Sequence, residues 1–290
     1  NILVAVAHVG TGKMGEALAM AGTGITAIWP PAGITFVSLF LLGWRIIPGI
    51  WFGAFYCGCA GLLAASADPL MTHCWGAGAL MGVGTVTAGY LGSDALRRIM
   101  VRRPHLREVS QTALLLLVGA TSCLLSASIG TLVLSTLAYV PWTSFGEVWL
   151  TWWSGDTLGI FVIAPLLLAF LVPEPTVARS RHVEAIGVIA LTAAVSSCVF
   201  LESFVTGRLV STEDFILLPF LTWAGLRLGL RHTTMLLALV SIIVVIGTAE
   251  GYGPYAHPNL TEAFLRMSAS LILTVPTILL VAVTTQERGH

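Results

Sequence analysis

The chain has 290 residues, of which 56% are hydrophobic and only 10% are charged, and its mean hydropathy is +0.90. Because a soluble domain carries about 25% charged residues, this composition excludes an ordinary soluble protein. The formal net charge is zero, so net charge gives no indication of nucleic-acid binding. We expect one integral membrane domain over residues 1–290.

Apolar runs separated by helix-breaking residues predict about ten helical segments. A bilayer core needs about 20 helical residues, and most of the runs approach that length. The predicted segments are 1–17, 29–43, 47–66, 73–96, 110–137, 148–171, 183–203, 214–227, 232–248 and 262–284. The expected fold class is therefore all-α, a polytopic transmembrane bundle of about 8–10 helices, two of them short or interrupted.

The first unusual feature along the chain is the Trp-Pro-Pro segment, residues 29–33, which contains Trp29, Pro30, Pro31 and Gly33. Proline has no backbone N–H, so this doublet cannot lie inside a regular helix without breaking it. In a bilayer, irregular backbone is tolerated only where protein or a water-filled cavity surrounds it. We expect Trp29 to point into the bundle and the segment to line a protected site.

Two of the predicted segments are unusually short, the stretch 30–43 and the stretch 214–227, and the second contains Pro219. Both segments start near proline and end beside an arginine, Arg45 or Arg227. Short, interrupted segments in corresponding places can indicate a binding site between structural repeats. We expect the two arginines to clamp helix ends or, alternatively, to contact a cytoplasmic output element.

The segment 73–96 is rich in glycine at four-residue spacing, which lets helices approach closely. Packing within the chain is the first interpretation of this pattern, and a dimer face is the alternative. The five cysteines, Cys57, Cys59, Cys74, Cys123 and Cys198, lie in or beside apolar runs and include no C-x-x-C spacing, so zinc is not expected. On a helix, Cys57 and Cys59 would point to different faces.

Arginines in the loop 97–107 predict the orientation, because basic loops stay in the cytoplasm. Alternating the segments from this loop places most of the 14 Lys and Arg residues on the same side. An even number of crossings then leaves both ends of the chain cytoplasmic. The chain begins at Asn1 and ends at His290, just past an apolar segment, so we expect it to be the membrane part of a longer protein.

Asp156 is the strongest single candidate for a functional side chain. It lies about two turns into the segment 148–171, and an aspartate at mid-membrane costs about 2.5–3.5 kcal/mol on insertion scales. It must therefore face a cavity or a partner, and Lys13 and Arg266 are the candidate cations. Two interpretations stay open: a structural ion pair or neutral hydrogen-bonded acid, and a ligand-binding or signal-coupling group.

The expected ligand-binding or signal-coupling residues come from the outer half of several segments. Tryptophans such as Trp149 and Trp153 also suit an interfacial aromatic belt. The full set is Trp29, Pro30, Pro31, Gly33, Trp152, Asp156, Gly159, Pro219, Trp223 and Arg266. Motifs of nucleotide-binding loops, serine hydrolases and zinc proteases are absent from the sequence, so no catalytic residue, metal or cofactor is expected in this chain.

Four sequence blocks carry a resemblance that spans nearly the whole chain. They are 28–33 (IWPPAG), 42–45 (LGWR) with 48–50 (PGI), 152–159 (WWSGDTLG) with 164–166 (APL), and 218–220 (LPF) with Trp223 and 227–229 (RLG). In these blocks the chain resembles the type one family of bacterial membrane-associated sensor domains, the MASE family.

This resemblance implies an N-terminal sensory module of a histidine kinase or a diguanylate cyclase in the bacterial inner membrane. It also implies a cytoplasmic output domain after residue 290, with homodimerisation through that output. We expect a ligand or partner protein to bias two packings of the bundle, and the last segment, with Pro276 as a bend point, to carry the change. The alternatives are a small-molecule transporter or channel, and a scaffold that recruits another membrane protein.

Overall fold

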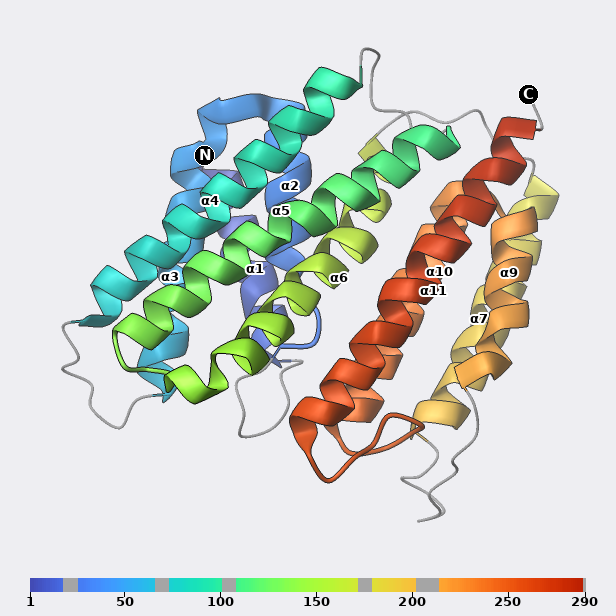
Figure 1. Cartoon of the computed structure of the whole chain (residues 1–290). Helices are drawn as coiled ribbons and strands as arrows, with labels where there is room; N and C mark the ends of the chain where they lie inside the picture. The colour runs from blue at the N-terminus through green and yellow to red at the C-terminus, as the bar shows by residue number, and fades with distance from the viewer. Residues whose placement is uncertain (18–25, 66–72, 101–107, 172–178, 202–213, 289–290) are drawn as a thin grey trace. The chain divides into compact units, whose positions relative to one another are not determined.

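The computed structural model describes residues 1–17, 26–65, 73–100, 108–171, 179–201 and 214–288 (Figure 1). These residues form α-helices and short 3₁₀ segments, with no β-strand among the described elements. Part of the basic loop, residues 101–107, lies outside the described residues. The prediction of an all-α bundle is confirmed.

Each of the ten predicted segments corresponds to a helix. The helices are α1 (Ile2–Ala17), α2 (Pro30–Leu42), α3 (Ile47–Ala65), α4 (His73–Ile99), α5 (Val109–Thr136), α6 (Phe145–Leu171), α7 (Arg179–Leu201), α9 (Leu218–Arg227), α10 (Gly229–Ala249) and α11 (Leu260–Arg288). Short 3₁₀ segments precede α3, α6 and α9.

Among the described residues, six stretches are long and apolar enough to cross a bilayer, which makes the chain a multi-pass membrane protein. They are Pro30–Ala64, Val109–Thr136, Trp142–Leu171, Val183–Leu201, Gly229–Ala249 and Leu260–Arg288. The first of these joins α2 to α3. By itself α9 has only 10 residues, about 15 Å of helix against a hydrocarbon core of about 30 Å.

The chain forms two compact units. Unit 1 contains residues 1–101 and 117–160, and unit 2 contains residues 102–116 and 161–290. The helices α5 and α6 contribute residues to both units, because α5 passes from unit 2 into unit 1 and α6 passes from unit 1 into unit 2.

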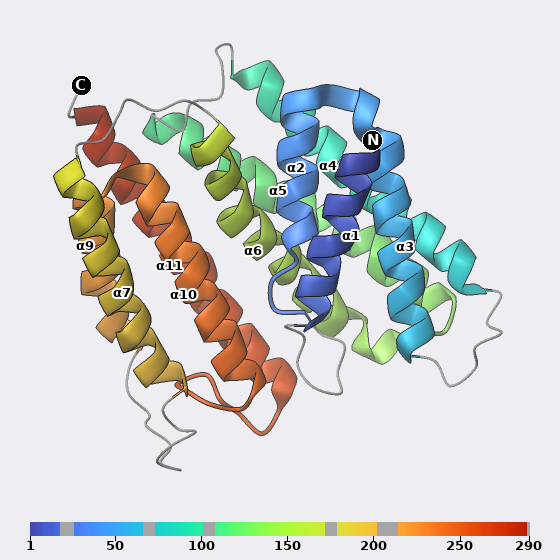
Figure 2. The same cartoon turned by 180° about the vertical axis from the view of Figure 1, so that it is seen from behind.

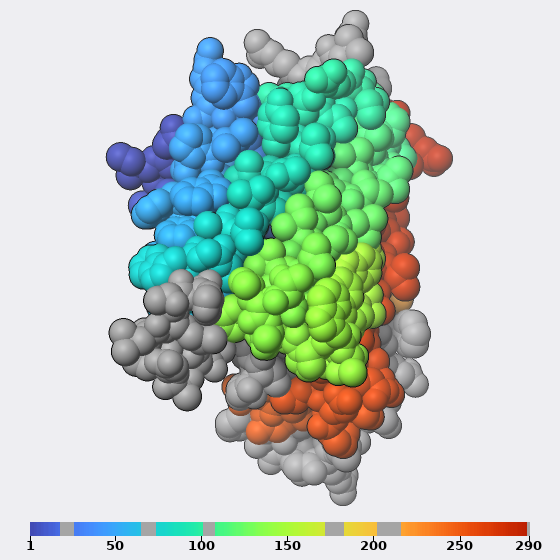
Figure 3. Space-filling model, turned by 60° about the vertical axis from the view of Figure 1, so that its left-hand side comes forward, coloured from blue at the N-terminus to red at the C-terminus, as the bar shows by residue number. Residues whose placement is uncertain are grey.

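Helix packing in unit 1 depends on the glycines of α4. A Cβ added at five of them would lie 2.5–3.2 Å from atoms of α2, α3 or α5: Gly78, Gly82, Gly84, Gly89 and Gly92. The interpretation of this glycine pattern as packing within the chain is therefore confirmed. The space-filling view shows α4 and α5 in continuous contact (Figure 3).

Each unit contains a short helix with proline in its first turn and a glycine of positive φ just after its end. In α2, Pro30 and Pro31 occupy the first turn, where no backbone N–H is needed. Pro219 occupies the same place in α9. The glycines that follow, Gly43 and Gly229, have φ values of +75° and +76°, a conformation that side chains disfavour.

The two units also pair their helices in the same way. In unit 1, α1 packs on α2 and α3, while α4 packs on α2 and α3; the view from behind shows α1 beside α2 and α3 (Figure 2). In unit 2, α7 packs on α9 and α10, while α11 packs on α9 and α10. The correspondence expected for the two short segments thus extends to the helices around each of them.

Candidate functional site

The backbone of the Trp-Pro-Pro segment docks on α6. The backbone N–H of Trp29 donates a hydrogen bond to the carbonyl oxygen of Gly155 at 3.0 Å. A Cβ added at Gly159 would lie 2.0 Å from the carbonyl oxygen of Trp29 and 2.7 Å from its carbonyl carbon. Only glycine at 159 leaves room for this backbone, so two of the predicted sequence blocks meet here.

The indole ring of Trp29 packs on α1. The ring thus points into the bundle, as predicted. A Cβ added at Gly15 would lie 3.1 Å from the ring, and one added at Gly12 would lie 3.6 Å from it. Pro31 and Gly33 are buried in the same region, and Pro30 is half-buried. The segment is therefore held by α1 on one side and by α6 on the other.

Asp156 is only 5% exposed, and its carboxyl group faces α5. The side chains that donate hydrogen bonds toward it are Ser126 of α5 and Trp152, one turn earlier on α6. The indole of Trp152 in turn covers Gly130 of α5, where an added Cβ would lie 2.4 Å from the ring. Asp156 thus lies in a largely enclosed position among neutral donors.

Neither predicted cationic partner pairs with Asp156. Lys13 binds Glu16, three residues along α1, with an N–O distance of 2.6 Å. Arg266 binds Glu262, one turn earlier on α11. In the described part of the chain, no ion pair involves Asp156, so neither candidate cation pairs with it there.

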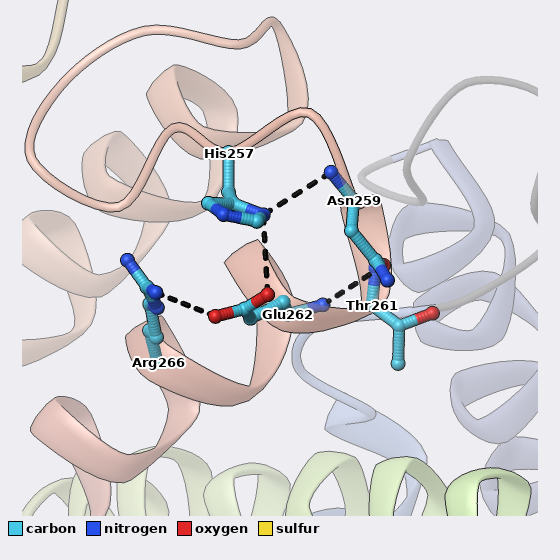
Figure 4. A network of polar contacts seen from close by, with 5 residues as sticks. All are labelled: His257, Asn259, Thr261, Glu262 and Arg266. Carbon is cyan, nitrogen blue, oxygen red and sulfur yellow. Dashed lines mark hydrogen bonds and ion pairs between the residues drawn. The ribbon is translucent and has the colours of Figure 1, made fainter.

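Arg266 binds Glu262 at the start of α11 (Figure 4). The side-chain oxygen of Asn259 accepts hydrogen bonds from the backbone N–H groups of Thr261 and Glu262, at 3.0 and 3.3 Å. Glu262 also lies 3.4 Å from Nδ1 of His257. The Asn259 side chain caps the N-terminus of α11. Arg266 binds Glu262 in the same first turns of the helix.

The remaining predicted residues are Pro219, Trp223 and Arg227 of α9, in unit 2, and Arg45, in unit 1. Pro219 is in the first turn of α9, and Trp223 is 51% exposed. The guanidinium of Arg227 lies 5.8 Å from the centre of the Trp223 ring, and its Nε is 3.2 Å from Oε1 of Glu184 on α7. In unit 1, Arg45 is exposed, and its carbonyl oxygen accepts a hydrogen bond from the Asn1 side chain.

Several neighbours of this site were not predicted. Gly155 with Gly159 has the small-x-x-x-small spacing that permits close helix approach, so the sequence did contain a signal for docking on α6. Ser126 had no such signal, because one serine in an apolar helix is unremarkable. The buried contact between Nδ1 of His8 and the Thr35 hydroxyl, at 3.2 Å, joins α1 to α2.

Two helices continue from the surroundings of Asp156 into unit 2. At its other end, α5 begins at Val109, whose N–H donates a hydrogen bond to the Glu287 carboxylate of α11 at 3.2 Å. Past Asp156, α6 reaches Ala169, whose carbonyl oxygen accepts a hydrogen bond from Nε of Arg231 on α10 at 2.7 Å. Each helix therefore connects the site covalently to a residue that contacts α10 or α11.

The groups gathered at the site suit recognition rather than bond making. A carboxyl, a hydroxyl and an indole N–H lie together in an apolar setting. Among the described residues, no group of three or more His, Cys, Asp or Glu side chains is placed to hold a metal ion.

One family of known proteins matches nearly the whole chain. The MASE1 family model matches residues 1–288, a range that includes all four sequence blocks. No curated protein and no solved structure matches the chain.

Proposed function

The chain belongs to the MASE1 family of membrane-associated sensor domains, and from this premise we propose that it is the input domain of a bacterial signalling protein. Its output would be a cytoplasmic histidine kinase or diguanylate cyclase attached after residue 290. The chain would lie in the inner membrane with both ends cytoplasmic, and dimerise through the output. Six apolar stretches support a membrane input domain.

In this proposal, the stimulus acts at the Trp-Pro-Pro segment and Asp156. The observation that carries it is the enclosed Asp156 carboxyl, which faces neutral donors and no cation among the described residues. A structural aspartate in a bilayer is normally paired. A carboxyl without such a partner is suited to a polar or cationic ligand group, or to a change of protonation state. The docked Trp29 backbone would form the wall of the same site.

The signal would travel along α5 and α6. A ligand shifts an equilibrium only by binding one packing of the helices better than the other. A shift of α5 at Ser126 would be transmitted through one continuous helix to Val109, and from there to Glu287 near the end of α11. Arg227 and Arg45 would hold the inner ends of the short helices while this change occurs.

The test uses the full-length protein with its output domain, reconstituted in liposomes. We expect Asp156→Asn and Trp29→Ala to change output activity at least severalfold, because each alters one of the two packings. The matched controls are Glu147→Gln and Trp44→Ala, since Glu147 is an exposed acid of α6 and Trp44 is 65% exposed. Output within twofold of wild type for both test variants, at normal expression, would refute the proposed site.

Transport of a small molecule is the second candidate, and one observation favours it. Each unit has a short helix with proline in its first turn, α2 in one and α9 in the other, and transporters place such helices at substrate sites. Uptake of labelled solutes into liposomes that contain this chain would separate the two. Substrate flux above that of empty liposomes would favour transport, while output changes without flux would favour sensing.

A further inference from the structure

Two thiols and a phenol come from the second half of α3, the first turn of α4 and the segment after α5. Sγ of Cys59 on α3 donates a hydrogen bond to the carbonyl oxygen of Cys74, in the first turn of α4, at 3.3 Å. Both residues are free cysteines, and both are buried, with exposed fractions of 5% and 1%. The end of α3 and the start of α4 lie at the same end of unit 1 (Figure 1).

Both thiols lie on the face of α4 that contains Gly78. A Cβ added at Gly78 would lie 2.5 Å from Sγ of Cys59, so the Cys59 thiol fills the space left by that glycine. Cys74 lies four residues before Gly78, and residues at this spacing project from the same face of a helix. The Cys74 thiol therefore points to the side that receives Cys59, and the two thiols are near enough to interact electrostatically.

Tyr139, which follows α5, completes the cluster. Its hydroxyl oxygen is buried and has no hydrogen-bond partner in the described structure, although a buried hydroxyl normally has one. It interacts electrostatically with both Cys74 and Cys59.

From this arrangement we propose that Cys59 and Cys74 form a redox-active dithiol that closes to an intramolecular disulfide by exchange with a small apolar disulfide. One cysteine thiolate attacks the small disulfide, forms a mixed disulfide and releases one small thiol. The second cysteine attacks the mixed disulfide, closes the Cys59–Cys74 bond and releases a second small thiol. The two cysteines lose two electrons, the small disulfide gains them, and both protons leave on the released thiols.

Closure of this bond would tie α3 covalently to α4. Both thiols are buried in an apolar region, where a charged oxidant would lose its hydration. The disulfide that reacts with them must therefore be uncharged. The proposal does not depend on the sensory role or on Asp156, because it rests only on the geometry of α3, α4 and Tyr139.

The chain provides an internal control for the test. Cys57 also lies on α3 and is also buried, but its Sγ faces α1, where a Cβ added at Gly12 would lie 2.7 Å away. The prediction that Cys57 and Cys59 point to different faces is thereby confirmed. Cys57 is therefore a buried thiol of the same helix that faces α1 instead of α4.

The experiment treats the full chain in detergent micelles with 4,4′-dithiodipyridine and maps the linked peptides by mass spectrometry. We expect a Cys59–Cys74 disulfide in wild type and in Cys57→Ser, and its loss in Cys59→Ser and in Cys74→Ser. Peptide mapping of wild type needs no variant to fold, so the proposal stays testable if a serine variant does not express. Wild-type protein whose two thiols end reduced, as separate mixed disulfides, or linked to other cysteines would overturn it.

A kinetic measurement tests the role of Tyr139. If its hydroxyl stabilises the attacking thiolate, Tyr139→Phe should close the same disulfide to the same extent but roughly two- to tenfold more slowly, the rate factor of one ordinary hydrogen bond. An unchanged rate would show that Tyr139 takes no part, while leaving the mapped disulfide as the test of the dithiol itself.

Discussion

The contact between the Trp-Pro-Pro segment and α6 predicts that Gly159→Ala destabilises the protein. The new Cβ would lie 2.0 Å from the carbonyl oxygen of Trp29 and 2.7 Å from its carbonyl carbon. Both neighbours are backbone atoms, so no side-chain rotation relieves the clash. The segment must move away from α6, and the hydrogen bond from Trp29 to Gly155 is lengthened or lost.

The expected size follows from three contributions. Overpacking costs about 1–3 kcal/mol, and a hydrogen bond between membrane helices contributes about 0.6 kcal/mol. Replacing glycine by alanine inside a helix gains about 1 kcal/mol. We therefore expect a net loss of roughly 0.5–2.5 kcal/mol in the free energy of unfolding.

The control for this substitution is Gly61→Ala on α3, where an added Cβ meets no atom within 4 Å. That variant should gain up to about 1 kcal/mol from helix propensity alone, so the two substitutions should have opposite signs. Unfolding in mixed micelles of increasing SDS content, followed by circular dichroism, measures both. Equal effects of the same sign would show that the Trp29 backbone is not docked on Gly159.

Three further substitutions test separate contacts. A double-mutant cycle of Arg227→Gln and Glu184→Gln should give a coupling below about 1 kcal/mol that weakens with salt, because the Arg227 side chain is 61% exposed; a coupling that does not respond to salt would contradict this. Asn259→Ala should cost about 1 kcal/mol and increase hydrogen exchange in the first turn of α11, since it removes the cap, and unchanged exchange would contradict the capping role. Pro276→Ala should keep or raise stability, because it returns a hydrogen-bond donor to the interior of α11. The same substitution should reduce the amplitude of the output response. A full response would show that α11 needs no bend at this position.

Helix positions were predictable because apolar runs and breakers determine them directly. All ten predicted segments contain a helix, and the prolines noted near the start of the two short segments lie in the first turns of α2 and α9, although α9 begins at Leu218 and not at 214. It was harder to predict which helices pack against one another, because a uniformly apolar membrane helix has no polar face to indicate its orientation. The glycines of α4 were an exception, because small residues mark close approach even without polar patterning.

Within the site, sequence reasoning identified the blocks but not all of their partners. The inward position of Trp29 and the enclosed position of Asp156 followed from the cost of irregular backbone and of charge in lipid. Neither candidate cation pairs with Asp156 in the described structure, because each has a local partner: Glu16 lies three residues from Lys13, and Glu262 lies one turn from Arg266. Pairs at these spacings need no tertiary arrangement.

We propose that a change at Asp156 reaches the end of α11 through α5. Hydrogen exchange of the full-length protein in lipid nanodiscs, compared between wild type and Asp156→Asn, tests this most directly. We predict altered exchange at the amides around Val109 and in the last two turns of α11, near Glu287, with no such change in Glu147→Gln. Exchange that changes only around Asp156 and Ser126, while the end of α11 stays at wild-type values, would contradict the claim.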